Sequence, residues 1–314
     1  MKMSLRLVGT ACLLAGSALV AQARIDRVVE KQFNVAGTGT LYVETSGGAI
    51  RVMPSTDSVV RVKAKQRIQA SSEAEADELL RKLDLVIEQQ GNDVRAVAKY
   101  EPRMPGFHFG SWPPVQVEFE VSLPAAFATD LHTSGGGITV GDLAGKATLR
   151  TSGGSITVGK MGGSVDAHTS GGSITLAEAR GPTILKTSGG NISAGRVAGT
   201  ADISTSGGSI RIEAAEAPIR AHTSGGSVRA GIGGAFKDDC SLSTSGGSIR
   251  VTVDKAAAFR LDASTSGGSV DAEGLTITLA QASRNRSQLS GAVNGGGPLL
   301  KLRSSGGGIT IRTQ

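Results

Sequence analysis

From residue 131 onward, apolar and polar positions alternate in short segments that recur at a fixed distance along the chain. Every unit contains Thr-Ser-Gly-Gly or a close copy, at steps of 18 residues and later of 21. A fixed period of this size is typical of a solenoid, in which each turn buries its apolar face against its neighbours. The first residues of the copies are Thr45, Thr133, Thr151, Thr169, Thr187, Thr205, Thr223, Thr244, Thr265 and Ser304.

The columns of the repeat predict which side chains point inward. Positions two and four before the threonine are mostly apolar, whereas the position directly before it is polar, which indicates a β-strand. A second strand follows the glycines, because positions five and seven past the threonine are again apolar. The fifth position holds Ile138, Ile156, Ile174, Ile192, Ile210, Val228, Ile249, Val270 and Ile309.

The paired glycines separate two strands whose inward positions differ in parity. A straight strand cannot make that change, since a shift of one residue sends every side chain to the opposite face. The chain must therefore bend at Gly-Gly, and we expect glycine there for positive φ and for close backbone approach.

These patterns predict an all-β protein whose residues 131–314 form a parallel β-solenoid, or β-helix, with 18-residue turns. The crossover rule for parallel strands predicts a right-handed coil. Cys240 occupies an inward apolar column, so we expect a small buried side chain and no nucleophile.

Residues 24–130 predict a β-rich cap with an early repeat at 41–52 and one short helix. The helix is expected at 71–83, where serines precede acidic residues. Alternation predicts further strands at 59–67, 85–88, 94–100 and 115–123.

The end of the repeat is less regular. Residues 274–298 predict one more strand and a basic loop. The last turn stops close to Gln314, which suggests an open edge and self-association through that turn.

Residues 1–23 have the pattern of a secretory signal peptide. Lys2 and Arg6 precede an apolar stretch, and Ala21-Gln22-Ala23 fits a small-x-small cleavage rule. We therefore expect an exported protein, periplasmic, surface-bound or secreted, without a transmembrane segment after cleavage. Loss of the two basic residues lowers the net charge from +6 to +4, and the absence of a basic run argues against nucleic acid as a partner.

Two groups of side chains are candidate binding residues. His132, Arg150, His168 and Lys186 share the outward column before the threonine, which predicts an anion-facing strip that strengthens below about pH 6.5 as histidine charges. The alternative is an ordinary solvated face. The loop 101–114 carries an aromatic cluster that either contacts a partner or caps the core, formed by Phe107, His108, Phe109 and Trp112.

Other chemistries fit the sequence poorly, and we expect no cofactor. The glycine pairs precede strands and lack the Gly-Lys-Ser/Thr ending of phosphate loops, and no aspartate follows in the register of calcium β-rolls. Histidines in one column but two or three turns apart cannot share a zinc ion. The two longer turns carry three acids that could bind calcium weakly, namely Asp238, Asp239 and Asp254. The alternative is that these acids form ordinary surface ion pairs with neighbouring lysines.

The chain resembles a family of exported bacterial β-strand-repeat proteins known as adhesin-like or as a domain of unknown function. The likeness covers roughly residues 30–314 and is carried by the early repeat, the strand end Val121-Ser122-Leu123-Pro124, the recurrent T-S-G-G-x-I and the closing segment 293–309. It implies a β-helix-like shape, export and an adhesive or surface role, and no catalytic residues.

The sequence supports two hypotheses of function. The first is a non-catalytic exported β-solenoid that binds a cell-surface polymer or another envelope protein, or serves a structural role. The second is a glycan-active enzyme on a β-helix, which needs acids and a base clustered on adjacent turns around a groove.

Overall fold

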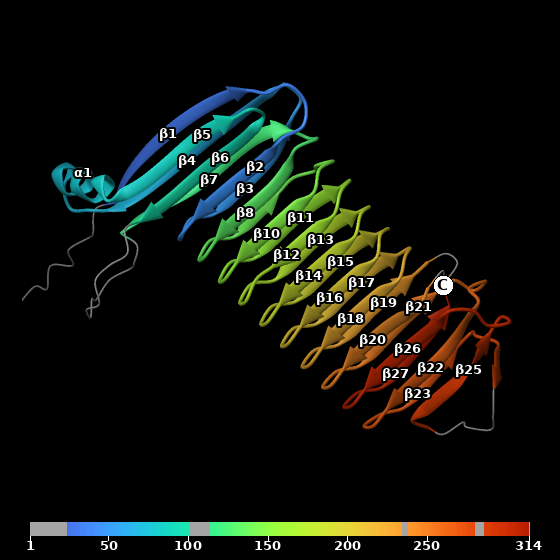
Figure 1. The fold of residues 1–314 in the computed structure, drawn as a ribbon. Helices are drawn as coiled ribbons and strands as arrows, with labels where there is room; N and C mark the ends of the chain where they lie inside the picture. Colours follow the sequence, from blue (N-terminus) through green and yellow to red (C-terminus); the bar gives the residue numbers. More distant parts are fainter. Residues whose placement is uncertain (1–23, 101–113, 234–237, 280–285, 314) are drawn as a thin grey trace, which may run out of the picture.

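The computed structural model describes residues 24–100, 114–233, 238–279 and 286–313. These residues form two long sheets that face each other along an elongated stack, with one short helix at the amino-terminal end (Figure 1). The predicted all-β fold with parallel turns is confirmed, whereas the hand of the coil stays a prediction. No helix in the described ranges is long and apolar enough to cross a membrane.

Sheet A contains the strands that follow the glycine pairs, together with cap strands at one end. Its spatial order is β1 (Arg24–Asn34), β4 (Val59–Gln69), β7 (Val115–Pro124), β3 (Ile50–Ser55), β9 (Ile138–Val140), β11 (Ile156–Met161), β13 (Ile174–Ala179), β15 (Ile192–Val197), β17 (Ile210–Ala215), β19 (Val228–Ile232), β21 (Ile249–Val253), β27 (Ile309–Thr313) and β23 (Val270–Glu273).

Sheet B contains the strands that precede the glycine pairs, together with two further strands at each end. Its spatial order is β24 (Ile277–Leu279), β25 (Gln288–Val293), β22 (Phe259–Thr265), β26 (Leu299–Ser304), β20 (Cys240–Thr244), β18 (Ile219–Thr223), β16 (Ala201–Thr205), β14 (Thr183–Thr187), β12 (Val165–His168), β10 (Ala147–Thr151), β8 (Ala128–Thr133), β2 (Thr40–Thr45), β6 (Asp93–Tyr100) and β5 (Leu83–Gln90).

Equivalent residues of successive turns lie opposite each other. Ile156 pairs in parallel register with Ile138 on one side and Ile174 on the other, and all three are fully buried. The two inner faces thus form one continuous apolar core, and Cys240 belongs to it. Burial raises the pKa of the Cys240 thiol, which fits the small buried side chain predicted at this position.

The buried threonine of each copy closes the corner between the sheets. The Thr169 hydroxyl donates to the carbonyl of Gly154 in the preceding turn at 2.8 Å and accepts the N–H of Gly172 at 3.3 Å. The same donation recurs along the stack from Thr45 to Thr265, and Ser304 replaces threonine in its turn. Threonine therefore satisfies two backbone groups that the bend would otherwise leave unpaired.

The second glycine of each pair is required by close packing. A Cβ on Gly172 would lie 2.0 Å from the carbonyl oxygen of Gly154, whereas one on Gly171 would lie 3.5 Å from that of Gly153. The expected positive φ is wrong, because the described glycines with positive φ all lie outside the Thr-Ser-Gly-Gly copies, at Gly37, Gly91, Gly274, Gly295, Gly296 and Gly297. Only the predicted close approach explains the glycine here.

The last turn of the sequence is not the last turn of the stack. β26 pairs with β20 on one side and β22 on the other, and β27 lies between β21 and β23. The expectation of an open edge at the final turn is therefore wrong, because that turn is covered on both sides. The outermost strands at this end are β23 in sheet A and β24 in sheet B.

The amino-terminal region builds the opposite end. β2 and β3 form an early turn that stacks directly on β8 and β9, and β6 and β7 extend it further. The helix α1 (Glu73–Arg81) begins after Ser72, whose hydroxyl accepts the N–H of Glu75, and its Ala76 is buried. The structure contains two strands that the sequence did not predict. One is β1, and the other is the second of the two strands in the segment 274–298.

Candidate functional site

A groove of about 570 Å³ runs along sheet B beside the Thr-Ser-Gly-Gly corners. It brings together all four basic candidates of the outward column: His132, Arg150, His168 and Lys186. Its other lining residues are Glu44, Lys99 and the threonines and serines of the corners at 45–46, 133–134, 151–152, 169–170 and 187–188. The aromatic candidates Phe107, His108, Phe109 and Trp112 lie outside the described residues.

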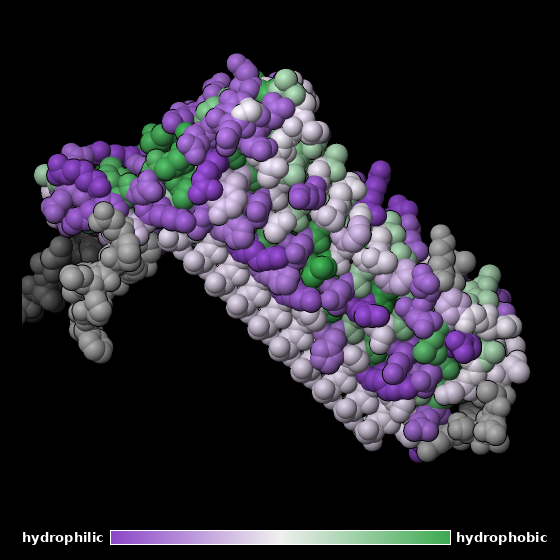
Figure 2. All heavy atoms as spheres, in the orientation of Figure 1, coloured by the Kyte–Doolittle hydropathy of each residue, from purple (hydrophilic) through white to green (hydrophobic). Residues whose placement is uncertain are grey.

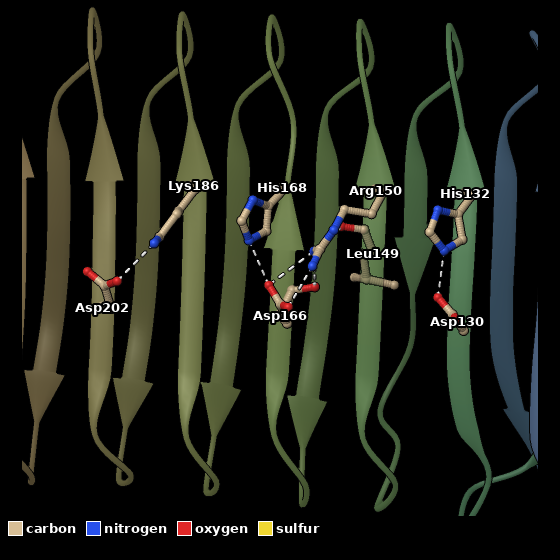
Figure 3. A network of polar contacts seen from close by, with 8 residues as sticks. All are labelled: Asp130, His132, Leu149, Arg150, Asp166, His168, Lys186 and Asp202. Atoms are coloured by element: carbon tan, nitrogen blue, oxygen red, sulfur yellow. Dashed lines mark hydrogen bonds and ion pairs between the residues drawn. The ribbon is translucent and has the colours of Figure 1, made fainter.

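The parallel register of β8, β10, β12 and β14 puts one basic residue on each successive turn. His132 lies opposite Arg150, Arg150 opposite His168, and His168 opposite Lys186 (Figure 3). Adjacent strands in a sheet are about 4.8 Å apart, so the four side chains span about 14 Å of the groove.

Each base of the column contacts an aspartate. In its own strand, that aspartate lies two residues before the column position. Arg150 reaches Asp166 of the next turn, with nitrogen–oxygen distances of 2.6 and 3.0 Å, and Lys186 reaches Asp202 of the next turn at 3.0 Å. The histidines pair within their own strands, His132 with Asp130 and His168 with Asp166, both at 2.7 Å (Figure 3). The bases are thus held in place by a parallel column of acids that is not part of the groove lining.

Asp166 is the shared partner of this network. Burial favours its neutral form, but the hydrogen bonds and charge of Arg150, together with His168, outweigh burial and lower the pKa of the carboxyl. Asp166 is therefore ionised at neutral pH, where it fixes the side chains of Arg150 and His168.

The same environment also lowers the pKa of His168. Burial and the positive charge of Arg150 lower the pKa of His168, and the opposing influence of Asp166 is smaller. His168 consequently gains its charge only below the ordinary histidine value, so its contribution to the predicted strip would begin at a lower pH than that of an unperturbed histidine.

The amino-terminal end of the groove is built by residues that the sequence did not indicate. Glu44 lies opposite His132 in the register, and its carboxylate binds Lys99 of β6 at 3.0 Å and accepts the hydroxyl of Tyr42 at 2.7 Å. Burial, reinforced by the hydrogen bond to Glu44, raises the pKa of Tyr42 to about 12. Arg95 stacks over the Tyr42 ring at 4.7 Å from its centroid.

An exposed row of serines borders the groove. Among the described residues, the hydroxyls of Ser134, Ser152, Ser170 and Ser188 have no hydrogen-bond partner, and all four residues are exposed. Figure 2 shows the corner edge of the stack as an evenly spaced row of residues of near-neutral hydropathy. The groove therefore offers a fixed cationic or imidazole group and a free hydroxyl on each of the four turns from His132 to Lys186.

The described residues contain no group of three or more His, Cys, Asp or Glu side chains that could hold a metal ion. Asp239, one of the acids considered for calcium, accepts the backbone N–H of Leu299 at 2.7 Å and anchors the inserted turn.

Comparisons with known proteins agree with this architecture. The family described as Toastrack DUF4097 matches residues 49–312. No curated protein matches the sequence.

Several solved structures match over nearly their whole length. A proposed adhesin from Parabacteroides merdae is 12% identical, with 92% of this chain and 96% of that chain covered and a TM-score of 0.44. A proposed adhesin from Parabacteroides distasonis is 14% identical, with 91% and 97% covered and a TM-score of 0.43. A proposed lipid-binding protein from the same species is 12% identical, with 91% and 96% covered and a TM-score of 0.42.

Proposed function

Because this chain belongs to the Toastrack DUF4097 family, whose description names no activity, we propose a function from the groove itself. The protein is an exported, non-catalytic binding protein of the bacterial cell envelope. Its ligand is an extended, hydroxyl-rich polymer bearing carboxylate groups, which lies across the turns in the groove beside the serine row.

The repetition of the groove carries this proposal. Its lining spans the turns that begin at Thr45, Thr133, Thr151, Thr169 and Thr187, so a ligand along the stack meets similar groups about every 4.8 Å. Arg150 and Lys186 supply donors for carboxylates, and the serine hydroxyls suit the hydroxyls of a glycan. A repeating ligand matches a repeating surface, because each added unit gains the same contacts.

The electrostatics of the groove favour binding over glycan cleavage. A glycosidase acid needs a carboxyl whose pKa is raised, so that it carries a proton at working pH. The pKa values of Asp166 and Glu44 are instead lowered by their hydrogen-bond partners against the effect of burial. These carboxylates position bases and are unsuited to donating a proton.

The test measures the affinity of residues 24–314 for polygalacturonate, with the neutral polymer dextran as the comparison. We expect polygalacturonate to bind at least tenfold more tightly than dextran. The double substitution Arg150→Gln and Lys186→Gln should weaken polygalacturonate binding at least tenfold.

The matched control is Lys146→Gln with Lys160→Gln, which removes the same charge from exposed positions away from the groove lining. Equal losses in the two double variants would mean that net charge alone attracts the polymer. That result, or equal binding of dextran, contradicts the proposed site.

A further inference from the structure

Sheet A carries a second basic column on the side of the molecule away from the groove. Arg211 of β17, Arg229 of β19 and Arg250 of β21 lie directly opposite one another in the parallel register. The equivalent positions in the preceding turns are small and uncharged, namely Thr139, Thr157, Thr175 and Ser193. Three successive turns thus carry like charge, and four turns that are uncharged at this position separate them from Arg51 at the same position of β3.

A hollow of about 210 Å³ lies at this column. Besides the arginines, it is lined by Ser209, Ile210, Ser227, Val228 and Ser248. Each serine stands two residues before an arginine and therefore on the same outer face of its strand. Every turn thus contributes one hydroxyl and one guanidinium to the hollow.

The charges around the hollow do not cancel. Arg211 forms an ion pair with Glu213, whose carboxylate also interacts electrostatically with Arg229, whereas Arg250 forms no ion pair among the described residues, so three arginines face one carboxylate. Arg312 of the next turn is occupied by Glu273 at 3.0 Å. Like charges on neighbouring strands destabilise a sheet, so an anion between them would relieve a repulsion that the fold itself leaves unbalanced.

The polar side chains that line the hollow are arranged as hydrogen-bond donors. Arginine has only donors, and the hydroxyl oxygens of Ser209 and Ser227 each accept a backbone N–H from the next turn at 3.1 Å. Those contacts use acceptor capacity and leave the hydroxyl hydrogens available to a ligand. A site of this kind suits a group that only accepts hydrogen bonds.

We propose that Arg211, Arg229 and Arg250, with the neighbouring serines, form a binding site for a tetrahedral oxyanion, a phosphate or sulfate group. The planar forks of adjacent arginines about 4.8 Å apart can each bind two oxygens of one such group. The hollow is smaller than the pockets of about 300–1,000 Å³ that enclose whole ligands, so it takes a single group, free or carried on a larger molecule.

The test measures the affinity of residues 24–314 for inorganic phosphate, inorganic sulfate and acetate by calorimetry at fixed ionic strength. We expect phosphate and sulfate to bind and acetate to bind at least tenfold more weakly. Arg229→Gln with Arg250→Gln should weaken phosphate binding at least tenfold, and Arg229→Lys should weaken it less, because it keeps charge but loses the fork.

Arg220→Gln is the matched control, since Arg220 is an exposed arginine of β18 in sheet B. Unchanged melting temperatures of the variants establish that they fold. A loss in Arg220→Gln as large as in the double variant, or acetate binding as tight as phosphate, overturns the proposal.

A parallel arm compares glucose 6-phosphate with inorganic phosphate. Tighter binding of the sugar phosphate assigns the group to a larger ligand, and equal binding assigns the site to the free ion. Failure of both phosphates to bind overturns the site without affecting the groove on sheet B.

Discussion

At the residue scale, the residues of each Thr-Ser-Gly-Gly copy have different structural roles. The threonine satisfies the backbone of the bend, the second glycine allows two corners to touch, and the serine faces solvent. The first glycine is less constrained: a Cβ on Gly171 would meet only ordinary contacts, although one on Gly246 would lie 2.8 Å from a carbonyl oxygen. The motif therefore serves shape chiefly through the threonine and the second glycine, and exposes the serine as a repeated hydroxyl.

Replacement of Thr169 by valine should lower the free energy of unfolding by about 2 kcal/mol, because a buried carbonyl and N–H lose their partner. Thr169→Ser should retain most of the stability, as Ser304 already makes these contacts in its own turn. Thermal unfolding of the two variants checks this. A loss in Thr169→Ser as large as in Thr169→Val would show that the methyl group matters as much as the hydroxyl, and an unchanged stability of Thr169→Val would contradict the role given to the hydroxyl.

The two glycines of one pair should respond differently to alanine. Gly172→Ala places a Cβ against the Gly154 carbonyl and should cost about 2 kcal/mol or more of stability. Gly171→Ala meets only ordinary contacts and should change stability by less than about 0.5 kcal/mol. Denaturant unfolding compares them, and similar effects in both would contradict the close-approach explanation.

The pKa of His168 should depend on the positive charge of Arg150, which lowers it. The pKa of His168 is lowered, so the neutral ring predominates at pH 7 and the groove gains this charge only as the pH falls below the usual histidine range. Arg150→Gln removes a positive neighbour and should raise the pKa of His168. An NMR titration of the ring protons measures both values, and an unchanged or lower pKa in the variant would contradict the assigned cause.

At the element scale, sequence patterns predicted the strands that have a buried face. The alternation around residues 59–67 and 115–123 corresponds to β4 and β7, whose inner residues are buried. β1 was not predicted, since none of its residues is fully buried and it pairs only with β4 at the sheet edge. Strand pairing at an edge leaves little trace in hydrophobic periodicity.

The candidate site was predictable where its residues belong to the repeat. A fixed period fixes the columns, so His132, Arg150, His168 and Lys186 could be aligned from spacing alone. Lys99 could not, because it reaches the groove through the parallel pairing of β6 with β2, which joins segments far apart in the sequence. The binding of Arg150 to Asp166 likewise depends on which turn lies next to it.

At the scale of the whole molecule, the order of the turns differs from their order in the sequence. Copies of the repeat are nearly equivalent, so no local pattern indicates that β26 and β27 insert between earlier turns. Contacts outside the repeat mark the insertion: Asp239 binds Leu299, and the Asn294 amide donates to the carbonyls of Lys255 and Ala257 at 2.9 Å.

Cysteine cross-linking can test that order. Ser241 lies directly opposite Lys301, which in turn lies opposite Asp262. In a Cys240→Ala background, Ser241→Cys with Lys301→Cys should form a disulfide, because neighbouring strands are within disulfide reach. Ser241→Cys with Asp262→Cys should not, since two strand spacings separate them by about 10 Å. Mass spectrometry of non-reduced peptides identifies which disulfide forms. A disulfide between positions 241 and 262, with none between 241 and 301, would show that the turns stack in the order of the sequence.

The central claim is that the stacked corners and bases form a binding groove over a defined part of the stack. NMR chemical-shift mapping with polygalacturonate tests it most directly, because one serine row runs both inside and outside the groove. The account predicts shifts at Ser134, Ser152, Ser170 and Ser188 and at the side chains of Arg150 and Lys186, with Ser206 and Ser224 unchanged. Uniform shifts along the row, or shifts confined to other surfaces, would contradict it.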